Sequence, residues 1–128
     1  MEHEEGEWHE IRVLDTRVQQ GQALALTDDV RDLLLRSAPT VAISDTEAKV
    51  ALANVESATA LLRKIRERIS EGSDRLSDAL FRMYELQEAG DLEGARQQMR
   101  DVLAVEVVPE YRELAEGELA KLSRLSKR

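Results

Sequence analysis

The 128-residue chain contains no cysteine, two prolines, six glycines and only four aromatic residues. The lack of cysteine excludes disulfide bonds, cysteine-ligated zinc fingers and catalysis by a thiol. Because proline and glycine are scarce, turns are few, and we expect few and long elements of secondary structure. Because aromatics are scarce, the core must consist of aliphatic side chains and alanine, which lets helices approach closely. The composition therefore indicates an all-α protein.

Acidic residues outnumber basic ones, since the net charge is −8 and the isoelectric point is near 4.8. Binding to nucleic acid requires a surplus of Lys and Arg, so we expect no nucleic-acid partner. No apolar run approaches the roughly 18 residues of a membrane-spanning helix. The acidic start MEHEEGEWHE is unlike a signal peptide. We therefore expect a cytoplasmic protein that has no membrane partner.

The strongest pattern present is a stripe of apolar residues spaced three and four apart. Its members are Ala48, Ala51, Val55, Ala58, Leu62, Ile65 and Ile69. This spacing keeps one narrow face toward a partner helix, as in an antiparallel hairpin or a coiled-coil seam. The same register continues through Leu76, Ala79, Met83 and Leu86. We predict a helical bundle built on a long antiparallel helical hairpin, with two shorter N-terminal helices.

Capping residues and helix breakers place the boundaries. Thr27, the Ser44–Glu47 capping box and Asp91 predict helix starts, and Pro109 predicts a kink or a new start. An acidic flexible tail is expected at residues 1–7, followed by a single domain at 8–126. The expected helices cover residues 8–20, 28–37, 45–71, 74–89, 91–107 and 110–125.

The sequence leaves open whether residues 45–89 form one helix or two. Gly72, Ser73 and Asp74 favour a break, because glycine costs about 1 kcal/mol inside a helix and Ser or Asp can cap a new one. A hairpin broken at this point would not need to keep the same hydrophobic register on both sides. The register nevertheless continues across Gly72. One long helix, with a kink allowed at the Gly-Ser pair, is therefore favoured. In a continuous helix, Gly72→Ala should stabilise the fold by up to about 1 kcal/mol.

The sequence offers no pattern of catalytic or metal-binding residues. His3 and His9 lack the paired Glu-x-x-His motif of a di-iron bundle, and their acidic segment is better explained as a solvated tail. Carboxylates such as Asp28 and Asp29 are not distinguished from a solvated helix face. No glycine-rich phosphate loop or nucleophile elbow is present. We therefore expect no enzyme, no metal and no cofactor.

Two groups of residues are candidates for binding a protein partner. The first is the hairpin end of the stripe, which the C-terminal segment is too short to cover once Pro109 bends it: Leu76, Leu80, Phe81, Met83 and Tyr84. Exposed apolar stripes usually find partners, so this group predicts a two-fold symmetric homodimer. The second, suited to an acidic partner or the chain's own acidic tail, is the basic cluster of Arg63, Lys64, Arg66 and Arg68. For this cluster the favoured interpretation is structural, since cations often flank a seam near a helix end.

Three stretches that together span most of the chain resemble the DUSAM family, a domain of unknown function that is multiplied in myxobacterial genomes. They are ALTDDVRDLLLRSAPTVAIS (25–44), ERISEGSDRLSDALFRMYEL (67–86) and AGDLEGARQQMRDVLAVEVVPEYRELAE (89–116). The resemblance implies a bacterial cytoplasmic setting and a regulatory or interaction role. It transfers no catalytic residues.

These observations lead to two hypotheses of function. The first is a non-enzymatic helical module for protein–protein interaction or regulation, which associates with itself. The alternative is a sensor bundle that responds to a small molecule bound between its helices, with bends at Gly72 and Pro109.

Overall fold

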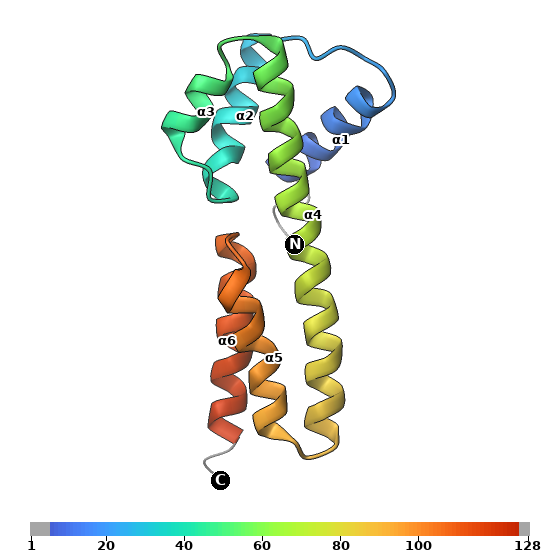
Figure 1. Cartoon of the computed structure of the whole chain (residues 1–128), viewed down its shortest axis with the longest axis vertical. Coiled ribbons are helices and arrows are strands. Elements are labelled where there is room, and N and C mark those ends of the chain that lie inside the picture. Colours follow the sequence, from blue (N-terminus) through green and yellow to red (C-terminus); the bar gives the residue numbers. More distant parts are fainter. Residues whose placement is uncertain (1–5, 126–128) are drawn as a thin grey trace. The chain divides into compact units, whose positions relative to one another are not determined.

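The computed structural model describes residues 6–125, apart from the side chain of Glu7. In this part of the chain there are six helices and no strand (Figure 1), which confirms the predicted all-α class. The helices are α1 (Glu7–Gln19), α2 (Asp28–Thr40), α3 (Asp45–Ala51), α4 (Val55–Glu88), α5 (Leu92–Val105) and α6 (Pro109–Leu125). Most of the expected acidic tail lies outside the described residues, and Glu7 already belongs to α1.

The chain divides into two compact units between Ile69 and Ser70, and α4 contributes residues to both. The N-terminal unit contains α1, α2, α3 and the first part of α4. Its predicted caps are present, since Thr27 Oγ1 accepts a hydrogen bond from Val30 N at 3.2 Å and Ser44 Oγ accepts one from Glu47 N at 3.1 Å. Its core consists of aliphatic residues around the indole of Trp8: Ile11, Leu34, Val41, Ile43, Leu62, Ile65 and Ile69.

The helix that the stripe predicts from residue 45 onward is interrupted at residues 52–54. Asn54 Oδ1 accepts a hydrogen bond from Ser57 N at 2.9 Å, and the hydroxyl of Ser57 donates to Ala51 O at 2.5 Å. Asn54 therefore caps the start of α4, and the chain turns while these polar groups stay satisfied. Leu52 is buried, whereas Val55 is 45% exposed, so the seam begins at Ala58.

From Ala58 onward the three-and-four spacing holds without interruption, and we call this stripe the α4 seam. Its eight positions are all buried: Ala58, Leu62, Ile65, Ile69, Gly72, Leu76, Ala79 and Met83. The helix is continuous through Gly72, Ser73 and Asp74, as the preserved register favours. The first half of the seam supplies the core of the N-terminal unit, and the second half supplies the core of the C-terminal unit.

Gly72 occupies a seam position because α6 approaches the backbone of α4 there. A Cβ atom at this position would lie 2.6 Å from Tyr111 Cε2, closer still to Tyr111 Cδ2, and 2.9 Å from Glu106 Oε1. Real Cβ atoms are not found this close to other atoms. Only glycine therefore leaves room for the Tyr111 ring, so we expect Gly72→Ala to destabilise the fold, opposite to the gain that helix propensity alone predicts.

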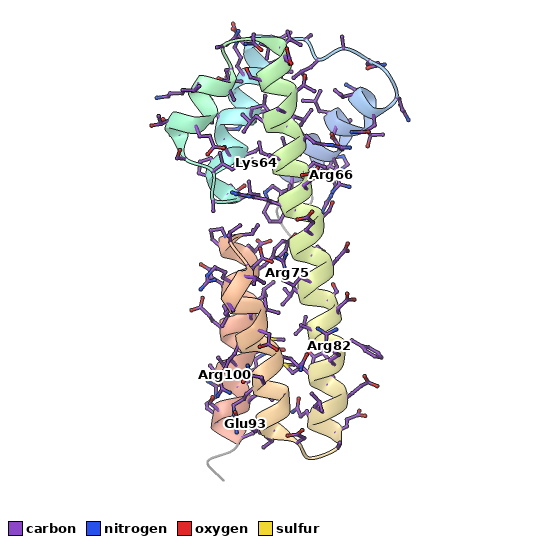
Figure 2. All side chains as sticks on the ribbon, viewed as in Figure 1. Lys64, Arg66, Arg75, Arg82, Glu93 and Arg100 are labelled. Atoms are coloured by element: carbon purple, nitrogen blue, oxygen red, sulfur yellow. The ribbon has the colours of Figure 1, made fainter. Side chains whose placement is uncertain are left out.

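Glu106 joins the three helices of the C-terminal unit. Its side chain is 1% exposed, and its Oε1 lies 2.7 Å from Nη1 of Arg75 on α4, which is labelled in Figure 2. Its Oε2 accepts hydrogen bonds from Val107 N at 3.1 Å and Val108 N at 3.0 Å. The buried carboxylate is thus paired and hydrogen-bonded, as a charge in a protein interior must be. Pro109 follows at the first position of α6, where its missing N–H costs nothing, so it starts a helix and does not kink one.

Leu62→Asp tests the seam. Leu62 is fully buried, so the substitution places a carboxylate without a partner in the core and should lower the free energy of unfolding by at least about 3 kcal/mol. Ala60→Asp is the matched control, because Ala60 is exposed two residues away on the same helix. A circular-dichroism melt that showed equal losses for both variants would contradict the buried seam.

Gly72→Ala tests the close approach of α6. The clash with Tyr111 should lower the free energy of unfolding by about 1–3 kcal/mol, despite alanine's better helix propensity. Chemical denaturation followed by circular dichroism measures the change.

Gly117→Ala is the control for Gly72→Ala. A Cβ at Gly117 of α6 would meet nothing within 4 Å, so this variant should be stabilised by about 0.5–1 kcal/mol. In a Tyr111→Leu background, the loss caused by Gly72→Ala should shrink or change sign, because the clashing ring is gone. A Gly72→Ala loss that stayed the same without the ring would rule out this contact as its cause.

Candidate functional site

Two residues of the predicted basic cluster, Arg63 and Arg66, face a buried carboxylate of their own unit. Asp15 of α1 has a side chain that is 8% exposed, and its Oδ2 lies 3.2 Å from Arg63 Nη1 and 4.0 Å from Arg66 Nε. The structure buries Asp15 and leaves Leu14 half-buried, because the two arginines of α4 compensate the charge.

The other two cations of the cluster are also engaged within the N-terminal unit. Lys64 Nζ lies 2.7 Å from Glu47 Oε2, and this hydrogen bond lowers the pKa of the exposed Glu47 carboxyl. Arg68 Nη1 donates to Val41 O at 2.8 Å and to Ala42 O at 3.0 Å. The cluster ties α1, α3 and the turn after α2 to α4. We therefore do not propose it as the site for an acidic partner.

The five residues of the predicted hairpin-end surface separate into two groups. Leu76 and Met83 are seam residues in the core, and Leu80 is half-buried. Phe81 is 66% exposed and Tyr84 is 51% exposed. The seam is covered because the chain turns back at residues 106–108, so that α5 and α6 pack as separate helices along α4. We had expected residues 91–125, bent at Pro109, to be too short to cover this end of the stripe.

The apolar surface that remains extends from α4 onto α6, and we call it the α4/α6 face. Its members are Leu80, Phe81, Tyr84 and Leu114, and Leu114 is 45% exposed. Leu80 and Leu114 line a hollow of about 250 Å³ together with Gly117, Glu118, Glu113 and Lys121. Leu114 was not predicted to be a surface residue. Its position outside the predicted apolar face of this helix could have indicated that it is exposed.

A hydrogen bond crosses this face. Tyr84 OH donates to Glu118 Oε1 at 3.1 Å, and Lys121 Nζ lies 3.1 Å from the other oxygen of Glu118. The hydrogen bond to Glu118, together with the negative charge of that carboxylate, raises the pKa of the Tyr84 phenol. The hydrogen bond therefore directs the phenol toward α6 at the edge of an exposed apolar patch.

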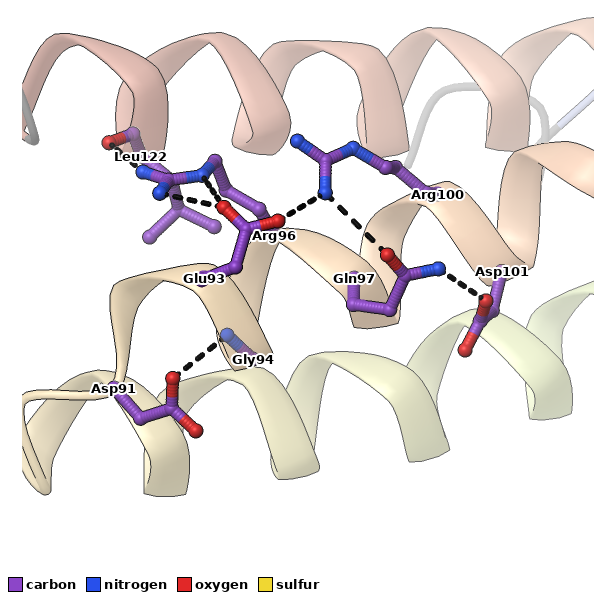
Figure 3. A network of polar contacts seen from close by, with 8 residues as sticks. All are labelled: Asp91, Glu93, Gly94, Arg96, Gln97, Arg100, Asp101 and Leu122. Carbon is purple, nitrogen blue, oxygen red and sulfur yellow. Dashed lines mark hydrogen bonds and ion pairs between the residues drawn. The ribbon is translucent and has the colours of Figure 1, made fainter.

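The charged network on α5 runs along its own helix, and Arg96 Nη1 also donates to Leu122 O of α6 at 3.5 Å (Figure 3). Glu93 Oε2 lies 2.8 Å from Arg96 Nη2 and its Oε1 lies 2.6 Å from Arg100 Nη1, and these hydrogen bonds lower the pKa of Glu93. Gln97 Nε2 donates to Asp101 Oδ1 at 2.8 Å further along the same helix. Such pairs along one helix surface stabilise the helix modestly and do not indicate a ligand site.

A second concave surface lies in the N-terminal unit, between α1 and α2. It encloses about 560 Å³, and its lining consists of His9, Glu10, Val13, Leu14, Arg17, Asp29, Val30, Asp32, Leu33 and Arg36. Arg36 Nη2 lies 3.7 Å from Glu10 Oε2 across it. Cations and carboxylates line it together, so it has no clear preference for the charge of a ligand.

Residues 6–125 contain no group of three or more histidine and carboxylate side chains arranged to hold a metal ion. His3 lies outside the described residues, and His9 lines the α1/α2 surface. Within the same range, no helix combines the length and apolar character needed to cross a membrane.

Comparison with known proteins yields one match. A family model described as a protein of unknown function (DUF2379) matches residues 6–122, which is nearly the whole chain. No curated protein and no solved structure matches it.

The Tyr84–Glu118 hydrogen bond can be tested by titration. Because the raised pKa reflects the ionised Glu118, Glu118→Gln should lower the midpoint of Tyr84 ionisation, measured by absorbance at high pH. A raised folded pKa favours the neutral phenol, so its contribution to stability is present below the unfolded pKa and is lost as the pH rises through the folded pKa. Tyr84→Phe removes the absorbance change of Tyr84 and so shows which ionisation step belongs to it. The other tyrosine, Tyr111, is buried. An unchanged midpoint in Glu118→Gln would contradict the hydrogen bond.

Proposed function

We propose that this chain, which belongs to the DUF2379 family of unknown function, is a non-enzymatic helical module that binds proteins through its α4/α6 face. The observation that carries the proposal is the exposure of three large apolar side chains, Phe81, Tyr84 and Leu114, on a unit whose core is already complete. Phe81 and Tyr84 lie about one turn apart on α4, and neighbouring exposed apolar residues are typical of interaction sites.

The core of the C-terminal unit does not need these side chains. Met83, Met99, Tyr111 and Leu122 are buried without any help from Phe81, which has most of its surface in water. Tyrosine and phenylalanine are among the residues that contribute most to binding energy when a partner removes them from water. The face is therefore better explained by an interaction than by the stability of the fold.

Self-association is the form of interaction that the sequence predicts, and it is part of this proposal. A second copy would cover Phe81 and Tyr84 with its own face about a two-fold axis, in a pairing of coiled-coil type along α4. The myxobacterial, cytoplasmic setting implied by the resemblance to DUSAM proteins is retained as a further part of the proposal. A regulatory role suits a small module of that kind.

The predicted dimer should depend on salt. Asp78 and Glu85 flank Phe81 on α4 and would approach their counterparts in a second copy, so screening should favour association. Sedimentation equilibrium at tens of micromolar should show more dimer at about 0.5 M salt than at about 0.05 M salt. Phe81→Glu should abolish the dimer without lowering the melting temperature by more than a few degrees, because Phe81 is exposed.

The matched control for this experiment is Val50→Glu, which replaces another exposed apolar residue, on α3 of the N-terminal unit. It should leave the salt-dependent dimer unchanged. A 14.4 kDa monomer at every salt concentration would remove self-association from the proposal. A dimer that survived Phe81→Glu would show that association uses another surface.

The second candidate function is the small-molecule sensor, and the α1/α2 surface favours it. Its volume of about 560 Å³ falls within the range of ligand pockets, and apolar Val13, Val30 and Leu33 lie among its charged lining residues. A thermal-shift screen of metabolites tests this candidate. A ligand whose shift disappears in Val30→Glu would support the sensor over the interaction module.

A further inference from the structure

The exposed side of α4 in the C-terminal unit carries a second regular pattern, which we call the Phe81 stripe. Its members recur at intervals of four and three residues and are all exposed: Asp74, Asp78, Phe81, Glu85 and Glu88. At 3.6 residues per turn, these positions lie on one narrow side of α4, opposite Leu76, Ala79 and Met83 of the seam. Phe81 thus stands at the centre of the stripe, with two carboxylates toward each end.

The four carboxylates of the stripe outnumber the arginines of α4 beside them, Arg75 and Arg82. Among residues 6–125, none of these side chains makes an ion pair or a hydrogen bond. Of these two arginines, Arg75 pairs with Glu106, whereas Arg82 Nε donates to the neutral Gln98 Oε1 at 2.7 Å and keeps its positive charge (Figure 2). The stripe therefore presents an apolar centre between two regions of net negative charge.

This charge pattern is unfavourable for a second copy of the same chain. In an antiparallel pair centred on Phe81, Asp74 of one copy would face Glu88 of the other. In a parallel pair, each carboxylate would face its own counterpart. Like charges brought together across an interface weaken binding and select against the wrong partner. A second copy should therefore bind the Phe81 stripe only weakly when the salt concentration is too low to screen these charges.

We infer that the preferred occupant of the Phe81 stripe is a basic amphipathic helix of another protein. Such a helix would cover Phe81 and Tyr84 with apolar residues at its centre, and Lys or Arg about one turn to either side would meet Asp78 and Glu85. The stripe extends over about 21 Å, so a helix of four turns would match it. This inference rests on the proposed function, because it names the partner of the same surface.

Binding of a model peptide tests the inference. The probe is a labelled 14-residue amphipathic helix built from leucine and lysine, compared with a counterpart in which glutamate replaces every lysine. Fluorescence anisotropy should show that the lysine peptide binds the full chain and the glutamate peptide does not. Binding of the lysine peptide should weaken as salt is added, which is opposite to the salt dependence of the dimer.

Matched variants decide whether the Phe81 stripe is the site. Asp78→Asn with Glu85→Gln should weaken binding of the lysine peptide by about tenfold, and Phe81→Ser should weaken it by a similar factor of about ten. The control pair Glu56→Gln with Glu116→Gln removes the same charge from exposed positions outside the stripe and should change the affinity by less than about twofold.

The failures of the two proposals can be told apart. Equal weakening by the stripe pair and the control pair would overturn the inference, because the peptide would then respond to net charge alone. Equal binding of both peptides, or no effect of Phe81→Ser, would also overturn it. A salt-dependent dimer lost in Phe81→Glu would still support the proposed function in each of these cases. Loss of both the dimer and the peptide binding in wild-type protein would overturn the proposed function as well.

Discussion

The fold depends on the seam along α4, and the seam depends on one position that has no side chain. Seven of its eight residues fill the cores of the two units with apolar side chains, and at Gly72 the ring of Tyr111 from α6 takes the space where a side chain would be. Glycine at this position lowers the stability of the helix by about 1 kcal/mol relative to alanine. In return it buries a tyrosine ring, whose area is large enough to outweigh that loss.

In the described part of each unit, one buried carboxylate is bound by arginine from α4. Asp15 faces Arg63 and Arg66 in the N-terminal unit, and Glu106 faces Arg75 in the C-terminal unit. Buried pairs of this kind fix geometry more reliably than they add stability, because desolvation offsets much of the attraction. They also use Arg63, Arg66 and Arg75 of α4 within the units. The surface left for a partner is the opposite side of α4, which is acidic around Phe81.

Much of the fold could be predicted from local signals. The spacing of apolar residues identified the seam, the caps at Thr27 and Ser44 placed two helix starts, and the preserved register favoured continuity across Gly72. The break before Val55 was missed because the stripe ran on through residues 51–55, although Asn54 followed by Ser57 carries a capping signal. Phe81 and Tyr84 were identified as candidate surface residues, but Leu76 and Met83 were placed with them in error. Their exposure depended on how far α5 and α6 reach along α4.

The sequence by itself determined the helical class, the residues that share each helix face, and the acidic charge, because these follow from the 3.6-residue period and from composition. The tertiary structure alone decided which faces are covered and by what. It made Gly72 a contact point for Tyr111, converted the basic cluster into internal pairs, and left Phe81 outside a completed core. The physical reason is that periodicity is local, whereas burial depends on residues distant in the chain that no spacing within one helix can specify.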